Sequence, residues 1–571
     1  MRDRDLLGSH QPQKLPRRVL DCVCGIGART GLDNSEVFTG RIFGIPFKTD
    51  QELLRFAYVM NRFSRVVAAP ISSLSVSAIF YSISAYNDFP ASNQNMHALH
   101  ASVLSGLTPA LSEDWLYTTT DPFPLATWIT ALFLKLGPGG IYFLYFVTIA
   151  TFIAAVMTFL DHNDRKDALA SYLWRGLIVL SALVLGRLTG LSAGVAGQYI
   201  LGEYWQPSEA GVFLVLSILL FASRWPTWSA ACAALAVALH PSIALGALIL
   251  QTAAAIRLVV ERQWKELFVL GGVFTVLVLP PLTHTLIQFM PTTDELADKA
   301  SRVLARDKIP FHAIPTQWVT TLDILKVFMI ALAAYICRRQ QPRLSSVLFI
   351  SLILGTITTV IFSYLDDNRL LLLFPWRVSA VLAPIALILI VSAVFNGLPN
   401  KWIYNNQKLI FIPILVLAAS VQFMKIYYDY PGFMPAYWIG ATFTGDDYNV
   451  KVQDRLDRMD VINWAKRRQD PMDVYLVPLD FAQFRIKSGL PIFVDWKSHP
   501  FKDTEVIEWE RRLGVAEQAF KSLRECKKID SNEFNMVIVD NSSSFYNKVA
   551  PGCSLYTEKQ INSRFGFVKL R

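Results

Sequence analysis

The chain has 571 residues, of which 53% are hydrophobic and only 17% are charged, and its mean hydropathy is +0.35. Soluble globular proteins carry about 25% charged residues, so these values exclude an ordinary soluble enzyme and predict a polytopic α-helical membrane protein. The net charge of +9 does not indicate a nucleic-acid partner. The basic residues sit mainly in the N-terminal tail and in short loops beside apolar runs, where membrane proteins keep them.

Residues 1–67 form a polar, basic tail without an early apolar core. We therefore expect no cleavable signal peptide and place this tail in the cytoplasm.

From residue 68 to residue 427 the sequence predicts about eleven membrane spans, because a helix needs roughly 20 apolar residues to cross the hydrocarbon core. The predicted spans are roughly 68–86, 138–160, 172–192, 209–222, 227–240, 241–257, 267–287, 321–337, 344–364, 373–395 and 408–427.

The distribution of lysine and arginine predicts the orientation of these spans. Alternate gaps between spans are basic, which marks the cytoplasmic side. The remaining gaps are long, aromatic or acidic, and we assign them as external loops: 87–137, 193–208, 288–320 and 365–372. An odd number of spans then places the C-terminal residues 428–571 outside the cytoplasm.

Two stretches of the external loops have the pattern of helices that lie on a membrane surface. Residues 124–136 are apolar on one side, and residues 292–308 mix charges with apolar residues at helical spacing. Both predict amphipathic interfacial helices.

Residues 428–571 have the composition of a soluble domain. Short strands are predicted at 474–477, 491–494, 536–539 and 565–568, and helices at 454–468 and 504–523. This alternation predicts a small α/β domain. Its two cysteines, Cys526 and Cys553, either form a disulfide or remain two free thiols.

The first external loop contains the acidic pair Glu113 and Asp114 in largely apolar surroundings. A carboxylate here could act as a general base toward a hydroxyl, or hold a divalent cation against a phosphate; the alternative is a solvated helix cap. Glu203, among aromatic residues of the second external loop, could share a catalytic or metal site with Asp114. The sequence leaves the cofactor unknown, with a divalent cation as the one candidate.

Three histidines are candidates for substrate binding. His97 and His100 are three residues apart and could share one face of a helix, although two histidines are weak evidence for a metal. His240 lies at the turn of a tight hairpin, where an ionisable group near the membrane is a functional candidate and a capped turn is the alternative.

Cations of the external loops could bind a lipid phosphate. Arg369 and Arg377 lie at the external end of the tenth predicted span, and Lys299 and Arg302 lie in the amphipathic segment 292–308. Arginine can bind a phosphate with two parallel hydrogen bonds. Pairing with Asp366 or Asp367 is the alternative for the two arginines.

Around the predicted strand ends of the soluble domain lie Arg485, Asp495, Trp496, Lys497 and His499. Strand ends often carry binding groups, but these residues form no recognisable catalytic triad. We expect structural roles for them.

The layout resembles the GT-C class of integral membrane glycosyltransferases, through its many spans, acidic first external loop, cationic external loops and C-terminal α/β domain. The segments NQNMHALH…SEDWLYTTTDPFP, FPWRVS and FRIKSGLPIFVDWKSHP are similar to parts of bacterial membrane proteins of this type. The resemblance implies a polyprenyl-phosphate-linked sugar donor and an acidic catalytic residue in the first external loop, which points to Asp114. The chain departs from the common pattern, because Asp88 stands alone directly after the first span.

We therefore expect a glycosyltransferase of the bacterial inner membrane that acts on the periplasmic side. Its partners would be membrane lipids, the lipid-linked donor, and a glycan, lipid or protein acceptor. Two alternatives stay open: a transporter or flippase for a lipid-linked saccharide, and a non-catalytic subunit of a polysaccharide assembly or export system.

Overall fold

The chain divides into two units, Met1–Val66 and Val67–Arg571. The computed structural model describes residues 41–42, 45–46, 70–82, 84, 89–161, 168–397, 446–468, 473–529, 532–543, 549–550 and 553–570. In the first unit, strands β1 (Arg41–Ile42) and β2 (Ile45–Pro46) form an antiparallel pair. The rest of the predicted basic tail and the predicted span 408–427 lie outside the described residues.

Helices form at the positions of the other ten predicted spans. The first is described at residues 70–82 and 84. The others are α5 (Gly139–Asp161), α6 (Ala168–Thr189), α7 (Gly211–Ala222), α8 (Pro226–Leu239), α9 (Ala244–Val260), α10 (Trp264–Gln288), α14 (Thr321–Cys337), α15 (Pro342–Leu365) and α17 (Val378–Gly397).

Five helical segments of the described chain are long and apolar enough to cross a membrane: Gly139–Leu160, Pro241–Val260, Trp264–Gln288, Pro342–Leu365 and Asn368–Gly397. The fold is therefore that of a polytopic helical membrane protein. Three further apolar helices are shorter, with 10–17 residues. The total of eleven spans stays a prediction.

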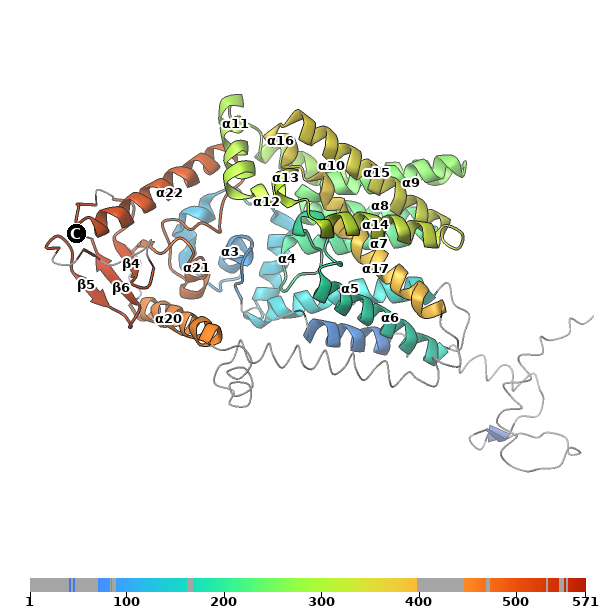
Figure 1. Cartoon of the computed structure of the whole chain (residues 1–571), viewed down its shortest axis with the longest axis horizontal. Helices are drawn as coiled ribbons and strands as arrows, with labels where there is room; N and C mark the ends of the chain where they lie inside the picture. The colour runs from blue at the N-terminus through green and yellow to red at the C-terminus, as the bar shows by residue number, and fades with distance from the viewer. Residues whose placement is uncertain are drawn as a thin grey trace, which may run out of the picture. The chain divides into compact units, whose positions relative to one another are not determined.

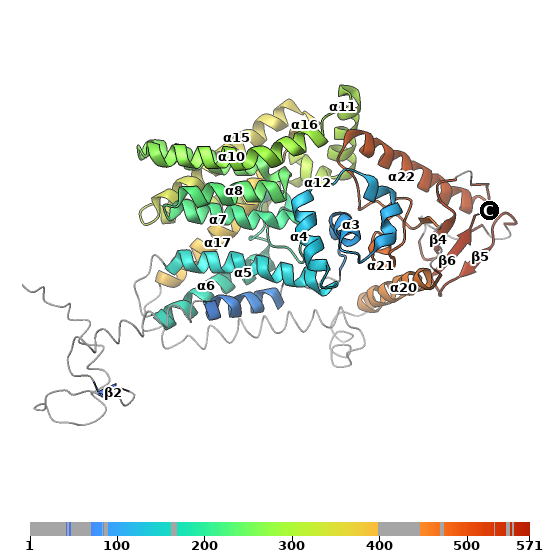
Figure 2. The same cartoon turned by 180° about the vertical axis from the view of Figure 1, so that it is seen from behind.

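The centre of the helical part is α17, in which every residue from Val378 to Ile388 is buried. It packs against α14, α6, α7 and α15. By contrast α10 has only Leu270 buried, so it lies at the edge of the bundle. In Figure 2, α10, α8, α7 and α5 run alongside one another.

Short elements fill the loops that the sequence predicts to be external. The first loop contains α3 (Gln94–Leu104), η1 (Pro109–Glu113), η2 (Trp115–Thr118) and α4 (Pro124–Leu134). The second contains η3 (Val195–Gly197) and η4 (Pro207–Ala210), and η5 (Pro241–Ile243) forms the α8–α9 turn. The remaining elements are α11 (Asp294–Arg302), the π-helix η6 (Val303–Lys308), α12 (Pro310–Ala313), α13 (Pro315–Trp318), α16 (Asn368–Leu371) and η7 (Pro375–Arg377).

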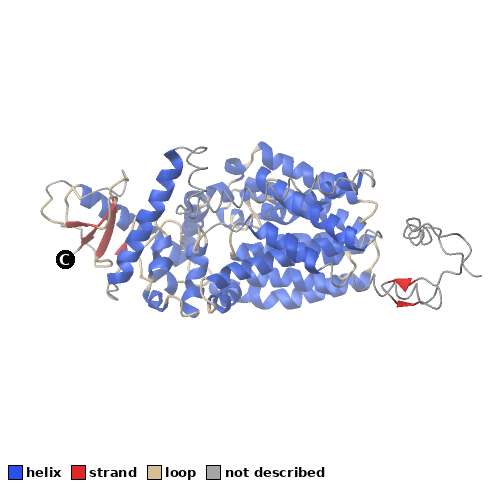
Figure 3. Cartoon of the chain, turned by 90° about the horizontal axis from the view of Figure 1, so that it is seen from below, coloured by secondary structure: helices blue, strands red, loops and turns tan. Residues whose placement is uncertain are grey.

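The C-terminal region forms a four-stranded sheet in the order β3 (Tyr475–Leu476), β4 (Met536–Asp540), β6 (Phe565–Lys569), β5 (Glu558–Gln560). The β3–β4 pair is parallel and the other two pairs are antiparallel. Among the described residues, strands occur only here and in the β1–β2 pair (Figure 3). The predicted strand at 491–494 is reduced to one bridge, between Ile492 and Tyr475.

Helices cover both faces of this sheet, as Figure 1 shows. In β4, Met536 and Ile538 face the core that includes α20 (Asp446–Arg468), while Val537 and Val539 face the core that includes α22 (Asp503–Arg524). This alternation is the period of two that a strand buried on both faces requires. A short helix, α21 (Gln483–Ser488), packs against α3.

One of the two predicted interfacial helices is corrected by the structure. Helix α4 exposes an apolar side, with Trp128 67% and Leu132 63% accessible, as a helix at a membrane surface would. The segment 292–308 instead turns its apolar side, with Ala300, Val303 and Leu304, into the core of the C-terminal domain. Its amphipathic pattern therefore reflects packing against the C-terminal domain of the same chain.

Several further contacts join the C-terminal domain to the external loops. Glu505 accepts hydrogen bonds from the backbone and hydroxyl of Thr120, at 2.9 and 2.8 Å. Asp503 accepts two from Thr292, at 2.6 and 3.0 Å. Within the domain, Cys526 and Cys553 form a disulfide, which decides the alternative that the sequence left open.

Candidate functional site

The strongest sequence candidate, Asp114, is fully buried between the first external loop and the C-terminal domain. One carboxylate oxygen accepts from the Leu116 backbone N–H at 2.9 Å. The other accepts from Arg485 Nε at 2.9 Å and from the Ile492 backbone N–H at 3.0 Å. Arg485 also donates to Asp495 at 2.6 Å, and all three side chains are at most 1% exposed. Asp114 thus belongs to an Asp–Arg–Asp clamp that joins the two parts.

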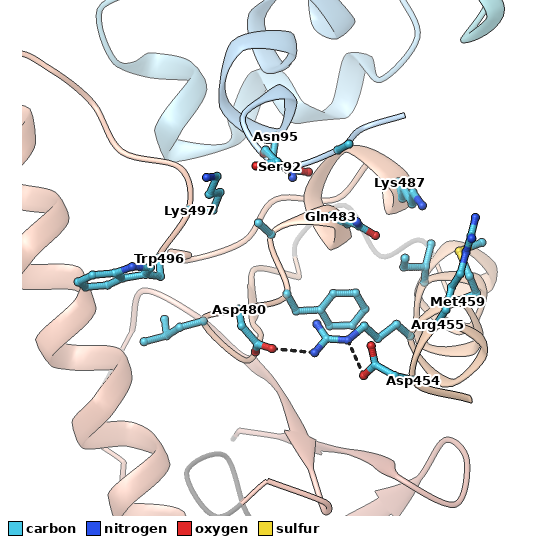
Figure 4. A pocket seen from close by; sticks show the side chains of 16 residues that line it. Ser92, Asn95, Asp454, Arg455, Met459, Asp480, Gln483, Lys487, Trp496 and Lys497 are labelled. Carbon is cyan, nitrogen blue, oxygen red and sulfur yellow. Dashed lines mark hydrogen bonds and ion pairs between the residues drawn. The ribbon is translucent and has the colours of Figure 1, made fainter. Parts of the chain in front are cut away.

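Beside this clamp lies a cavity of about 700 Å³, which we name cavity A. It is bounded by α20, α21, the segment Trp496–Lys497 and the start of α3 (Figure 4). Its charged lining consists of Arg455, Arg458, Lys487, Lys497, Asp454 and Asp480. Its volume lies in the range typical of ligand sites, roughly 300–1,000 Å³.

Both acids of cavity A are bound by one arginine. Arg458 donates to Asp454 at 3.1 Å and to Asp480 at 2.7 Å, and Asp454 also pairs with Arg564. The lining therefore has four cations against two carboxylates that already have cationic partners. The cavity is electrostatically positive.

Neutral groups of cavity A are suited to a polar ligand. Asn95 is 2% exposed and donates to the Ser92 carbonyl at 2.8 Å, but its Oδ1 has no hydrogen-bond partner among the described residues. Trp496, 43% exposed, lies near Trp509 with ring centroids 5.5 Å apart. A buried acceptor without a partner and a supported aromatic ring are features of a ligand site.

A second cavity of about 370 Å³, cavity B, shares Ala91, Ser92 and Gln483 with cavity A. Glu203 lines it and pairs with Arg187 at 2.5 Å. Burial raises the pKa of Glu203 to about 7, while the ion pair acts in the opposite direction. Glu203 is about 30% exposed, so a ligand in cavity B can reach it.

Three histidines, His97, His312 and His499, lie near Lys497, whose charge acts on all three. Burial lowers the pKa of His97 to about 3, and the charge of Lys497 adds to this shift. Burial likewise lowers the pKa of His499 to about 3 and that of His312 to about 4. The ring of Phe123 lies between His97 and His240, with centroid distances of 4.8 and 4.6 Å. His97, His312 and His499 are therefore neutral at physiological pH.

Two further cations lie around these histidines. The ammonium of Lys308, in the π-helix η6, donates to the Trp496 carbonyl and lies 4.8 Å from the Trp496 ring centre. Arg377 donates to Gln198 at 3.1 Å and to Ser242, which in turn contacts His240. The charges of Arg377 and Lys497 both lower the pKa of His312, and of the two cations only Lys497 lines cavity A.

The remaining sequence candidates lie apart from the two cavities. Arg369 pairs with Asp294 and Asp298 on α11, and Lys299 pairs with Glu510 on α22. Arg302 and Glu113 are exposed. Among the other candidates, the His100 ring stacks near Tyr117 and contacts the Thr119 carbonyl at 3.3 Å.

Asp114 and Glu203 are held by different arginines, Asp114 by Arg485 and Glu203 by Arg187. A metal site shared by the two acids stays a prediction. Within the described ranges there is no group of three histidine, cysteine or acidic side chains that could hold a metal ion.

Sequence reasoning missed Lys308, Arg455 and Lys487, and it assigned Lys497 a structural role. These residues come from a π-helix, two helices and a loop, separated by up to about 190 positions, and each resembles an ordinary surface cation in the sequence. A single sequence carries no signal that would have selected them.

The comparisons with known proteins give one family match and several distant structures. Residues 457–516 match the family described as "Domain of unknown function (DUF6798)". No curated protein matches the chain.

Among solved structures, the chain is similar to ArnT from Cupriavidus metallidurans bound to undecaprenyl phosphate, with 14% identity, 88% of this chain and 97% of that chain covered, and a TM-score of 0.45. The apo state of the same protein has 11% identity and a TM-score of 0.48, with 86% of this chain and 95% of that chain covered. The chain is also similar to the archaeal oligosaccharyltransferase AglB from Archaeoglobus fulgidus in complex with an inhibitory peptide and a dolichol-phosphate. The identity is 10% and the TM-score 0.41, with 84% of this chain and 70% of that chain covered.

Proposed function

We propose that the chain is a glycosyltransferase of the bacterial inner membrane, which transfers a sugar from a polyprenyl-phosphate-linked donor to an acceptor hydroxyl on the periplasmic side. The observation that carries the proposal is the juxtaposition of a positive cavity with a half-buried carboxylate. Cavity A supplies the cations, cavity B supplies Glu203, and the two meet at Ser92 and Gln483.

The donor phosphate would lie at the Lys497 side of the site. A lipid in the bilayer can present its phosphate at the external ends of the spans, close to Arg377. Lys497 and Arg377 would bind it through charge-assisted hydrogen bonds, and the neutral histidines around them can add further hydrogen bonds.

The reaction is a displacement at the anomeric carbon. The acceptor oxygen forms a bond to that carbon, the bond from the carbon to the phosphate oxygen breaks, and polyprenyl phosphate leaves with the electron pair. Glu203 takes the proton from the acceptor hydroxyl. Because a general base works best with a pKa near the operating pH, the raised pKa of Glu203 suits this role. The cations stabilise the charge that develops on the leaving phosphate.

In this proposal Asp114 positions other groups and does not take the proton. Its carboxylate has three donors already, and it is closed off from solvent. Through Arg485 and Asp495 it holds the Trp496–Lys497 segment next to the first external loop. A divalent cation would find Glu203 as the one acidic side chain lining cavity B, so we assign charge neutralisation to the lysine and arginine.

The periplasmic assignment of the C-terminal domain has two independent supports. One is the distribution of lysine and arginine between the loops. The other is the Cys526–Cys553 disulfide, since disulfides persist in the periplasm and are rare in the cytosol.

The test uses purified full-length protein in detergent with undecaprenyl phosphate as the ligand. We expect a concentration-dependent rise in the melting temperature, because a ligand that binds only the native state stabilises it. Lys497→Gln and Arg377→Gln should each weaken binding about tenfold or more, equivalent to about 1.4 kcal/mol. Lys135→Gln, which removes an exposed cation near the membrane, is the matched control and should bind like the wild type.

Turnover is then measured as release of undecaprenyl phosphate from a panel of undecaprenyl-phosphate sugars. No stabilisation of folded wild-type protein by undecaprenyl phosphate would overturn the proposal. Binding without turnover by any donor would favour the non-catalytic subunit, and movement of the lipid-linked sugar between leaflets without cleavage would favour the flippase.

A further inference from the structure

Cavity A has a second cationic end that the donor phosphate does not use. Arg455 on α20 and Lys487 on α21 both line the cavity. In Figure 4 they lie on one side of Gln483, and Trp496 and Lys497 lie on the other. Donor phosphate at Lys497 therefore leaves this second end facing whatever else enters the cavity.

The two cations of this end are close enough to repel one another. Burial, together with the charges of Arg455 and Lys466, lowers the pKa of Lys487 to about 8. The carboxylates in the lining, Asp454 and Asp480, are both held by Arg458. Arg455 and Lys487 both line the cavity, so an anionic ligand group there would be attracted by two positive charges.

The groups between the two ends suit a saccharide. Asn95 Oδ1 is buried without a partner and can accept a hydrogen bond from a sugar hydroxyl. The exposed side chain of Gln483 lines both cavities and can donate or accept. Ser92, three positions before Asn95, also lines both cavities. These groups lie where Glu203 would meet the acceptor hydroxyl.

We infer that the acceptor is an anionic saccharide, whose phosphate or carboxylate group is bound by Arg455 and Lys487 while its reacting hydroxyl lies at Ser92 and Gln483. The inference rests on the proposed transferase function. It goes further by naming the chemical class of the acceptor and the residues that select it. Arginine contributes a planar fork that matches either anion with two hydrogen bonds, and lysine contributes a compact charge.

The experiment compares three probes of similar size on the full-length protein: glucose 6-phosphate, glucuronate and glucose. The variant is Arg455→Gln/Lys487→Gln. The matched control is Arg467→Gln/Lys521→Gln, which removes two exposed cations of the same domain that do not line the cavity. Melting of each protein without ligand shows whether it is folded, and stabilisation against ligand concentration gives the dissociation constant.

We expect at least one of the two anionic probes to stabilise the wild type and the control, with an affinity at least tenfold higher than that of glucose. The probe that binds tells whether the anion is a phosphate or a carboxylate. In the Arg455→Gln/Lys487→Gln protein this preference should fall at least tenfold, while stabilisation by undecaprenyl phosphate should stay unchanged.

Equal binding of glucose and both anions by the wild type would overturn the inference, as would equal loss of anion binding in the control. An inorganic phosphate arm separates saccharide binding from binding of a bare anion: stabilisation by inorganic phosphate as strong as by glucose 6-phosphate would also overturn it. Failure of undecaprenyl phosphate to stabilise the wild type would instead count against the proposed transferase function, so the two failures are distinguishable.

Discussion

Replacing Arg485 with methionine should destabilise the junction between the C-terminal domain and the first external loop more than any surface charge change. Arg485 is 1% exposed and forms ion pairs with Asp114 and Asp495, which are both 0% exposed. The clamp carries one positive and two negative charges. The substitution leaves two buried carboxylates close together with no cation between them.

The free energy of unfolding should fall by about 3–5 kcal/mol, the usual cost of removing one partner of a buried ion pair. The same chain supplies a matched surface control. Arg511 also bridges two acids, Glu508 and Glu533, but its side chain is 45% exposed. Exposed pairs contribute about 0–1 kcal/mol, so Arg511→Met should have little effect.

The assay is thermal unfolding of the purified protein, combined with limited proteolysis to detect release of the C-terminal domain. A neutral variant, Asp114→Asn/Arg485→Met/Asp495→Asn, should recover much of the loss, because no buried charge is left without a partner. If Arg485→Met melted and resisted protease like Arg511→Met, the clamp would not join the two parts and the positioning role of Asp114 would be refuted.

The remaining predictions concern the proton transfer, the disulfide and the second cationic end. Glu203→Gln should abolish or strongly reduce turnover and leave the binding of undecaprenyl phosphate unchanged. Wild-type activity should rise as the pH passes about 7, because Glu203 deprotonates with a pKa of about 7. A Glu203→Gln protein with wild-type turnover would rule out the role of Glu203 as base. Cys526→Ser removes a disulfide between cysteines 27 positions apart and should lower the free energy of unfolding of the domain by about 3.5 kcal/mol in the chain-entropy model. An unchanged melting temperature, with and without reductant, would show that the bond does not stabilise the domain. The affinity of the wild type for glucuronate should fall between about pH 7 and about pH 9. Glucuronate keeps its negative charge over this range, while Lys487, with a pKa of about 8, loses its positive charge. An affinity that does not change with pH would contradict the contact with Lys487.

The candidate site could be predicted from the sequence only in its components. Asp114 and Glu203 were selected because acids in external loops of an apolar chain need a function. The sequence could not say that Asp114 would be closed in by Arg485, which is 371 positions away. Nor could it say that Glu203 would stay accessible beside a cavity. The distinction depends on packing between segments that are distant in the chain.

Arg377 shows the same division between composition and packing. Its position at the start of an apolar span indicated a functional cation. Its partners Gln198, Ser242 and, through Ser242, His240 come from the second external loop and the α8–α9 turn. Arg369, only eight positions earlier, instead forms ion pairs with α11. The sequence offered the two arginines as equal candidates, and only the fold separates them.

By itself, the sequence determined the class of the protein and the placement of most of its elements. Hydropathy is a local property, because any segment of about 20 apolar residues that enters a bilayer has to form a helix to satisfy its backbone; strand alternation in the C-terminal domain is local in the same way. The tertiary structure alone decided the clamp, the two cavities and the partners of each charge. Those depend on which segments pack together, and a charge becomes a clamp, a base or an anion site according to its burial and its neighbours.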